Sequence, residues 1–166
     1  MDIKLIPTRE DELEEFIGNI QASFQKGAVE EFGEDCKQVL PREDIDKALS
    51  AQGAEVLNIV RDNEIVGGAI VKINRETNHN ELMFFYMKVE YIGGGIGYKA
   101  WQAIENRYPD TKVWETATPY FEKRNIHFYI NKCGFHAVEF FNPHHPNKEM
   151  NDADYFFMFE KVMNHD

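Results

Sequence analysis

The alternation of apolar and polar residues predicts two helices in the first third of the chain. An apolar stripe from Leu13 to Phe24 recurs at i, i+3, i+4 and i+7, which predicts an amphipathic helix over about residues 9–26. Thr8 is its expected N-cap. A shorter apolar stripe after Pro41 predicts a second helix, and the segment between the two helices carries no clear pattern.

The period then changes to that of β-strands. Residues 56–60 and 65–73 predict two antiparallel strands joined by a tight turn. Gly67 and Gly68 inside the second of these strands indicate a bulge or a close approach of another backbone. Residues 82–89 are apolar on both faces, so we expect a central strand that is covered on both sides.

The second half of the chain alternates helices and strands. We expect, in order, a helix over 98–108, a strand over 111–118, a helix over 119–134 that starts at Pro119 and is capped by Gly134, a strand over 135–141, a polar loop over 142–153 and a last strand over 155–163. With a first strand near residue 3, the element order is β-α-α-β-β-β-α-β-α-β-β. This order predicts a single α/β domain over residues 1–166, built on a mixed sheet.

Composition supports a folded globular domain and narrows the choice of partners. The 166 residues are 43% hydrophobic, and 18 basic against 29 acidic side chains give a net charge of −11. An acidic surface repels phosphate backbones and anionic lipid, so neither nucleic acid nor a membrane is an expected partner. Residues 1–50 alone hold 13 acidic and 6 basic side chains, which concentrates the negative charge in the first third.

The sequence predicts a cytoplasmic location. Its N-terminal residues are acidic and lack the basic and then apolar order of a signal peptide. No apolar stretch approaches the roughly 20 residues needed to cross a bilayer. Cys36 and Cys133 allow at most one disulfide, and free thiols are the usual state in the cytosol.

The chemically most informative segment is a glycine run, residues 93–97, between a predicted strand and a predicted helix. Glycines let a backbone turn tightly and approach an anion. The free N–H groups at the start of the following helix favour negative charge. The run therefore predicts a phosphate or pyrophosphate site rather than a simple turn.

One alternative for this run is a dinucleotide site. Residues 95–100 match the G-x-G-x-x-A fingerprint, and Glu115 lies near the position of the acidic residue that binds ribose. The corresponding function would be a nucleotide-dependent oxidoreductase. Against it, a doubly wound sheet needs successive βαβ units, whereas a hairpin precedes the run and too few residues follow it.

The segment VEYIGGGIGYKAWQAIE, residues 89–105, resembles the acyl-coenzyme A binding motif of the GNAT acetyltransferase superfamily. That motif is written Q or R, any, any, Gly, any, Gly or Ala. Gly95 and Gly97 take its two small positions. Ile92 replaces the leading Gln or Arg, and Gly94 replaces the often basic residue between the glycines, so backbone N–H groups are left to do the binding.

A second segment strengthens this resemblance. NIHFYINKCGF, residues 125–135, is similar to a later helix of the family, which ends in Tyr, a few residues and then Gly-Phe. Tyr129, Gly134 and Phe135 match that pattern. The element order from about residue 3 to 163 also agrees with the family, so the resemblance covers nearly the whole chain.

The resemblance implies a three-layer α/β/α sandwich with a mixed, mostly antiparallel sheet and a central V-shaped split. Acetyl-CoA would be the acyl-donor co-substrate, with its pantetheine in the split. Backbone groups of the central strand would pair with the pantetheine amides, and N–H groups of the glycine run would hold the pyrophosphate. The implied cofactor-binding residues are Met87, Val89, Gly93, Gly94, Gly95, Ile96, Gly97, Tyr98 and Asn125.

The resemblance also implies direct acetyl transfer to a primary amine of a small molecule or peptide. Tyr129 would protonate the leaving thiolate, and a carboxylate or a water chain would deprotonate the amine. Glu81 at the start of the central strand and Glu115 on the neighbouring strand are the candidate bases, and a backbone N–H near Met87 would meet the oxyanion. The acidic first third favours a cationic acceptor.

The remaining expectations concern metal binding, oligomeric state and catalytic turnover. His144 and His145 are adjacent and lack a second metal-ligand motif, so we expect no metal site. Exposed sheet edges and the last strand would suit a homodimer. A non-catalytic acyl-CoA sensor stays open as an alternative beside the oxidoreductase, because a binding motif alone does not establish turnover.

Overall fold

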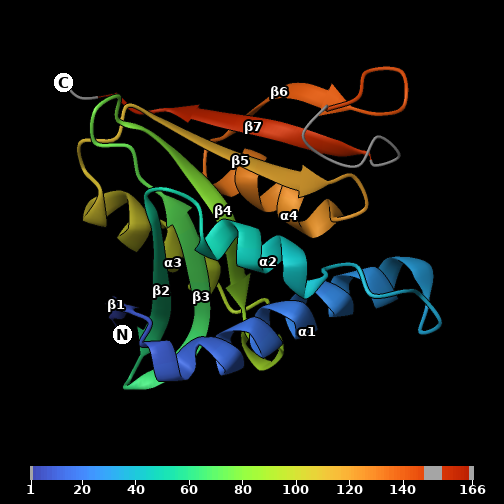
Figure 1. Cartoon of the computed structure of the whole chain (residues 1–166), viewed down its shortest axis with the longest axis horizontal. Coiled ribbons are helices and arrows are strands. Elements are labelled where there is room, and N and C mark those ends of the chain that lie inside the picture. The colour runs from blue at the N-terminus through green and yellow to red at the C-terminus, as the bar shows by residue number, and fades with distance from the viewer. Residues whose placement is uncertain (1, 148–154, 165–166) are drawn as a thin grey trace.

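The computed structural model describes residues 2–147 and 155–164, which form a seven-stranded sheet with helices on both faces (Figure 1). The strand order is β1-β2-β3-β4-β5-β7-β6, and every neighbouring pair is antiparallel except β4 and β5. The predicted mixed, mostly antiparallel sheet is therefore confirmed. The strands are β1 (Ile3–Pro7), β2 (Ala54–Arg61), β3 (Glu64–Lys72), β4 (His79–Met87), β5 (Val113–Pro119), β6 (His136–Phe141) and β7 (Phe156–Val162). The helices and helical turns are η1 (Glu10–Glu12), α1 (Leu13–Phe32), α2 (Arg42–Leu49), η2 (Val89–Tyr91), α3 (Ile96–Arg107), α4 (Lys123–His127) and η3 (Phe128–Lys132).

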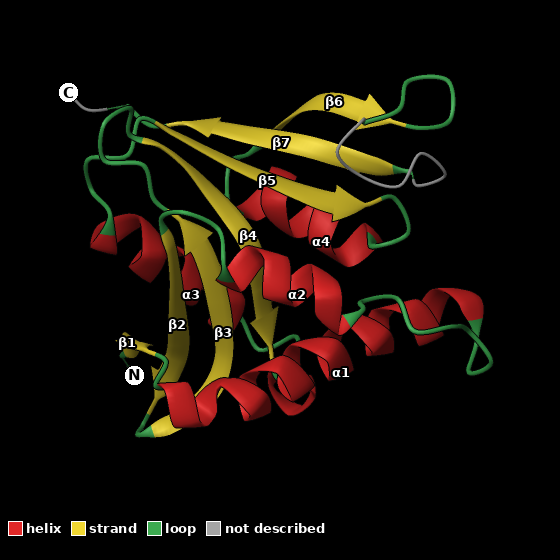
Figure 2. Ribbon diagram, in the orientation of Figure 1, coloured by secondary structure: helices red, strands yellow, loops and turns green. Residues whose placement is uncertain are grey.

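The sheet opens between its two parallel strands. Pairing of β4 with β5 ends where Leu82 lies opposite Thr116. Beyond that point β4 continues to Met87 and β5 to Pro119, and the two strands diverge (Figure 2). Because β5 stays paired with β7 along its length, one edge of β4 is left without a strand partner among the described residues. The sheet therefore has the V-shaped split that the resemblance implies.

Each face of the sheet has its own apolar core, which makes the fold a three-layer α/β/α sandwich. On one face Trp101 of α3 meets Trp114 of β5 edge-on, with 5.3 Å between ring centroids. On the other face Phe16 of α1 meets Tyr86 of β4 in the same way at 5.4 Å. Burial of such aromatic side chains stabilises the fold by about 25 cal/mol per Å² of apolar surface removed from water.

Helix α1 is longer than its apolar stripe predicts. It spans Leu13–Phe32 and follows the single 3₁₀ turn η1. Thr8 does not cap it, contrary to the prediction, because the Thr8 hydroxyl instead donates a hydrogen bond of 2.9 Å to Asn58 of β2, and Arg9 takes the N-cap position of η1. None of the helices within the described ranges, α1 included, combines the length and the apolar content that a membrane crossing requires.

The helix that follows β5 begins later than predicted. Pro119 closes β5 instead of opening the helix, and α4 spans only Lys123–His127. The chain then continues as a π-helical turn, η3, over Phe128–Lys132. Gly134, with a φ of 83°, follows that turn in the left-handed conformation, as expected of a C-terminal cap. Single π turns inside helices occur often at functional sites.

Gly67 and Gly68 are required where β3 packs against its neighbours. A Cβ at Gly67 would overlap the carbonyl oxygen of Tyr86, and a Cβ at Gly68 would overlap the rings of Phe16 and Tyr86. The register between β2 and β3 also shifts next to Gly67. The predicted bulge or close approach is confirmed, and both are present.

The paired histidines belong to a tight turn after β6. Asn142 and His145 exchange backbone hydrogen bonds of 3.1 and 2.9 Å. The His145 ring stacks on Phe141, and its Nε2 contacts the Glu139 carboxylate at 2.5 Å. In the part of the chain that the structure describes, no three His, Cys, Asp or Glu side chains are arranged to hold a metal ion. The rest of the predicted polar loop, residues 148–153, lies outside the described residues.

Candidate active site

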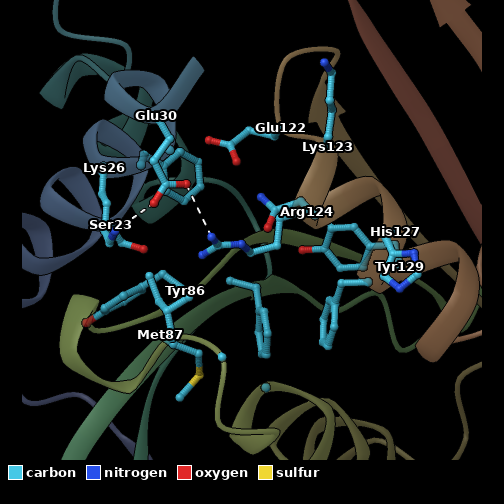
Figure 3. Close-up of a pocket in the computed structure, with 18 of the residues that line it drawn as sticks. Ser23, Lys26, Glu30, Tyr86, Met87, Glu122, Lys123, Arg124, His127 and Tyr129 are labelled. Carbon is cyan, nitrogen blue, oxygen red and sulfur yellow. Dashed lines mark hydrogen bonds and ion pairs between the residues drawn. The ribbon is translucent and has the colours of Figure 1, made fainter. Parts of the chain in front are cut away.

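A cavity of about 380 Å³ adjoins the end of β4, where that strand is no longer paired with β5. Four parts of the chain surround it, namely the second half of α1, the end of β4, the glycine run with the start of α3, and the helix formed by α4 and η3 (Figure 3). The second half of α1, the segment from the end of β4 to the start of α3, and the α4–η3 segment are far apart in sequence and meet only in the fold. A cavity of this size suits a small ligand or the reactive arm of a larger one.

Most of the residues that the sequence predicts for the site line this cavity. They share no element, since β4, the glycine run, α3, α4 and η3 all contribute. The fold therefore brings the predicted acid together with the predicted cofactor-binding backbone. The predicted residues in the lining are Met87, Gly93, Gly95, Gly97, Tyr98, Asn125 and Tyr129.

Three predicted cofactor-binding residues are not part of the cavity wall. Ile96 is buried in an apolar cluster below α3, with 7% of its surface exposed. Val89 lies on η2 with an exposed side chain. Gly94 belongs to the same loop as the lining glycines but does not itself line the cavity. These three residues could bind the cofactor, as the resemblance implies, only through their backbone groups.

The predicted base, Glu81, lies outside the cavity. It is at the closed end of the split, in register with Glu115 of β5 on one side and with Lys72 of β3 on the other. Phe85 is the first residue of β4 that lines the cavity, four positions later, which corresponds to about 13 Å along an extended strand. Glu115 does not line the cavity either, so the geometry brings neither candidate base to the predicted acid.

The glycine run has the backbone geometry of an anion site. Gly93 and Gly95 have φ values of 93° and 78°, a left-handed conformation that residues with a Cβ rarely adopt. Gly95 is the N-cap of α3, so the N–H groups of the first helical turn lack partners within the helix and carry its positive dipole end. Gly97 follows in that turn, and a Cβ there would already contact Phe128 at 3.5 Å. The segment therefore offers backbone donors where a pyrophosphate is expected.

Tyr129 of η3 presents its phenol to this cavity (Figure 3). Its side chain is almost fully buried, and that burial raises the pKa of the phenol well above its usual value. Thr116 of β5 is its hydrogen-bonding neighbour, and the Phe159 ring lies at 6.0 Å between centroids. The phenol is thus held protonated and in a fixed position, as a proton donor must be.

The second half of α1 forms a wall of the cavity through contacts with α4 and the loop before it. Figure 3 shows the Arg124 guanidinium crossing the cavity toward Glu30 of α1, and the two groups pair at 3.3 Å. Nearby, the rings of Phe32 and Phe121 meet edge-on with 5.1 Å between centroids. The sequence pattern did not indicate this wall because most of these contacts are polar or half-exposed and leave no apolar period.

Glu122 is a cavity residue that the sequence analysis missed. It directly precedes α4, and its side chain extends toward α1 near Arg124 (Figure 3). Burial raises the pKa of its carboxyl above the usual value. One sequence signal could have found it, since in the helix predicted over 119–134 Glu122 and Tyr129 are seven residues apart and would lie on the same side.

Sequence comparison identifies a matching family and a relative of this chain. A model of the Acetyltransferase (GNAT) family matches residues 17–135. A Bacillus subtilis (strain 168) protein, "Uncharacterized protein YrkN", is 49% identical over 169 residues, which cover 93% of this chain and 90% of that protein.

Solved acetyltransferase structures share the fold. The PaiA N-acetyltransferase of Thermoplasma acidophilum, in complex with coenzyme A, superposes with a TM-score of 0.68 at 19% identity and covers 98% of this chain and 100% of its own. A GNAT family acetyltransferase of Elizabethkingia anophelis with acetyl-CoA bound gives 0.68 at 13% identity, over 98% of this chain and 99% of its own. At such identities the likeness concerns the fold.

The strand order also decides between the enzyme classes. A doubly wound nucleotide-binding sheet needs several parallel strands in succession, whereas β4 and β5 are the only parallel neighbours among the described strands. The oxidoreductase alternative is therefore wrong. Because the family model covers most of the chain and the described fold is that of the acetyltransferases, this protein belongs to the GNAT family and is an acyltransferase.

Proposed function

We propose that this protein transfers the acetyl group of acetyl-CoA directly to a primary amine of a small molecule or peptide. The observation that carries the proposal is one cavity that joins the glycine run to the buried phenol of Tyr129 and extends to the wall made by α1. A pyrophosphate-binding loop, a proton donor and space for a second substrate are what a direct transfer needs.

The acetyl-CoA arm fits the residues that are present. The edge of β4 beyond Leu82 has no strand partner in the described part of the chain, so its backbone groups are available to pantetheine amides as an added strand would use them. Met87 ends that edge and lines the cavity. The N–H groups around Gly95 and Gly97 then meet the pyrophosphate, and acetyl-CoA supplies the thioester that the reaction consumes.

The proposed reaction needs one residue to protonate the leaving sulfur and another to deprotonate the amine. As the amine nitrogen bonds to the acetyl carbon and the carbon–sulfur bond breaks, Tyr129 gives its proton to the sulfur, because its raised pKa keeps the phenol protonated until then. A backbone N–H near Met87 stabilises the oxyanion. The amine must lose a proton before it attacks, which calls for a base inside the cavity.

We propose a cytoplasmic setting for this reaction. The two cysteines support it, since Cys36 and Cys133 are not joined in a disulfide. Cys133 is buried, and burial raises the pKa of its thiol to about 12, so it is a packing residue rather than a competing nucleophile. The acidic composition supports a small-molecule or peptide acceptor over a nucleic acid.

The test follows thiol release from acetyl-CoA in the presence and absence of a panel of primary amines, with products identified by mass spectrometry. We expect release that requires an amine and yields its acetamide. If coenzyme A stabilises the protein against heat but no amine in the panel elicits release, the proposed transfer to a primary amine is wrong. If NAD stabilises it and coenzyme A does not, the assignment of the cavity is wrong as well.

A further inference from the structure

The Glu122 side chain fits into the cavity because the facing residue of α1 is a glycine. Its carboxylate packs directly against Gly27 of α1, where any Cβ would overlap it. Although Glu122 is the residue at the N-cap of α4, its side chain makes no capping hydrogen bond to the helix. The carboxylate is thus directed away from its own helix and into the space between α4 and α1 (Figure 3).

The other carboxylates of the cavity are already neutralised. Glu30 pairs with Lys26 at 2.7 Å and with Arg124 at 3.3 Å, and Glu31 pairs with Lys123 at 3.7 Å. For Glu122, by contrast, no hydrogen bond or ion pair of its carboxylate is formed within the described ranges. The cavity therefore contains one acid that is free to bind a cation brought by a ligand.

The surroundings of this carboxylate favour proton exchange. Burial is the largest effect and raises the pKa of Glu122, whereas Arg124 in α4 lowers this pKa and Glu30 on α1 raises it. Tyr129 faces the same cavity from η3 and is close enough for Glu122 to raise the pKa of its phenol. A base with a raised pKa, just before α4, and an acid on η3 thus face one cavity.

We propose that Glu122 binds the ammonium group of the acceptor and is the general base that deprotonates it. The inference rests on the proposed acetyl transfer and assigns its missing base. Phe24 and Phe121 line the same cavity, and their apolar rings would hold the body of the amine. Glu122 therefore recognises one ammonium group attached to an apolar part.

The proton balance of this step closes. The bound ammonium gives one proton to the Glu122 carboxylate, which later releases it to solvent, and the neutral amine attacks the acetyl carbon. The carbon–sulfur bond breaks, and the sulfur takes the proton of the Tyr129 phenol. The second proton that the nitrogen loses on becoming an amide restores that phenol. One proton is released to solvent for each amine acetylated from its ammonium form.

The first experiment measures amine binding by titration calorimetry on protein saturated with coenzyme A. The probes are phenethylamine and 2-phenylethanol, which differ in the ammonium group. We expect the wild-type protein to prefer the amine and Glu122→Gln to lose at least about tenfold in amine affinity while binding the alcohol as before. Glu76→Gln, an exposed carboxylate in the β3–β4 loop, is the matched control and should bind the amine as the wild type does.

The second experiment moves the carboxylate without removing it. Gly27→Ala places a Cβ against the flexible end of Glu122, so the helix tolerates it while the carboxylate must shift. Gly18→Ala, in the same helix with nothing near its Cβ, is the control. We expect Gly27→Ala to lower amine affinity and amine-dependent turnover several-fold and Gly18→Ala to leave both unchanged.

These measurements separate the two proposals. If amine binding depends on Glu122 but no acetyl transfer occurs, Glu122 is the amine-binding residue and the proposed function is wrong. Acetyl transfer that Glu122→Gln leaves intact, with an unchanged pH profile, would refute the base and leave the function. Equal amine affinity in the wild type and Glu122→Gln, or no preference of the wild type for the amine, would overturn the inference.

Discussion

Tyr129 is both a packed core residue and the proposed proton donor. The phenol is buried among Phe128, Phe135 and Phe159, so its ring is held by aromatic contacts while its hydroxyl meets the cavity. Such a residue is fixed by its packing before any substrate binds, which is the arrangement that efficient proton transfer requires.

Replacement of Tyr129 by Phe removes the proton donor and keeps the ring. We expect kcat to fall by at least about a hundredfold, because the thiolate would leave unprotonated, with the Kd for acetyl-CoA nearly unchanged. Steady-state kinetics and titration calorimetry measure the two quantities. Tyr120→Phe, at a tyrosine that is 53% exposed and outside the cavity wall, is the control. Equal turnover in both variants would remove Tyr129 as the acid.

The glycine run allows a second prediction at single residues. Gly95→Ala forces a Cβ onto a backbone with φ of 78° and should cost about 1–2 kcal/mol of stability as well as affinity for coenzyme A. Gly94→Ala is the comparison, because its backbone is not left-handed and a Cβ there would meet only Ile96 at 4.0 Å. Urea denaturation should show a clear loss for Gly95→Ala alone. A similar loss of stability in both variants would mean that the left-handed conformation of Gly95 is not the reason why a glycine is required there.

Sequence patterns predicted site residues where a motif or the family resemblance names them. Gly95, Gly97 and Tyr129 belong to linear motifs and do line the cavity. Glu122 belongs to none, and its carboxylate packs against Gly27, nearly a hundred residues earlier in the chain. Glu81 was chosen by its place on the central strand, and the residues between it and the end of β4 separate it from the cavity.

At the level of elements, most of the fold follows from periodicity, and the exceptions are the cavity walls. The hairpin of β2 and β3, the central position of β4 and the span of α3 agree with the predictions. The end of α1 and the start of α4 do not. Both are held by ion pairs and by the edge-on contact of Phe32 with Phe121, which hydrophobic periodicity does not record.

The end of α1 should therefore be locally, not globally, sensitive to mutation. Phe32 is 59% exposed, so Phe32→Ala should change the free energy of unfolding by less than about 1 kcal/mol while amide hydrogen exchange in the last turns of α1 accelerates. Phe16→Ala, in the buried half of the same helix, should cost about 3–5 kcal/mol. Equal global losses in the two variants, or unchanged exchange in Phe32→Ala, would contradict a wall held by local contacts.

For the molecule as a whole, the acidity of the chain does not extend into its cavity. The net charge is −11, yet the cavity wall carries Lys26, Lys123, Arg124 and Lys132 beside Glu30, Glu31 and Glu122. An acidic protein can thus hold an anionic cofactor, because the local electrostatic potential depends on the backbone dipoles of the glycine run and on a cavity wall with both basic and acidic side chains. The acidic first third is consequently a weak guide to the acceptor.

The most direct test of the whole account is a titration of isotope-labelled protein with acetyl-CoA, followed by backbone amide NMR. We expect the largest shifts at the amides of residues 93–98, at the end of β4 and around Tyr129, which together outline the cavity. NAD at the same concentrations should leave these amides unmoved. Shifts confined to other surfaces, or a response to NAD in place of acetyl-CoA, would contradict the assignment of the split between β4 and β5 as the acetyl-CoA site.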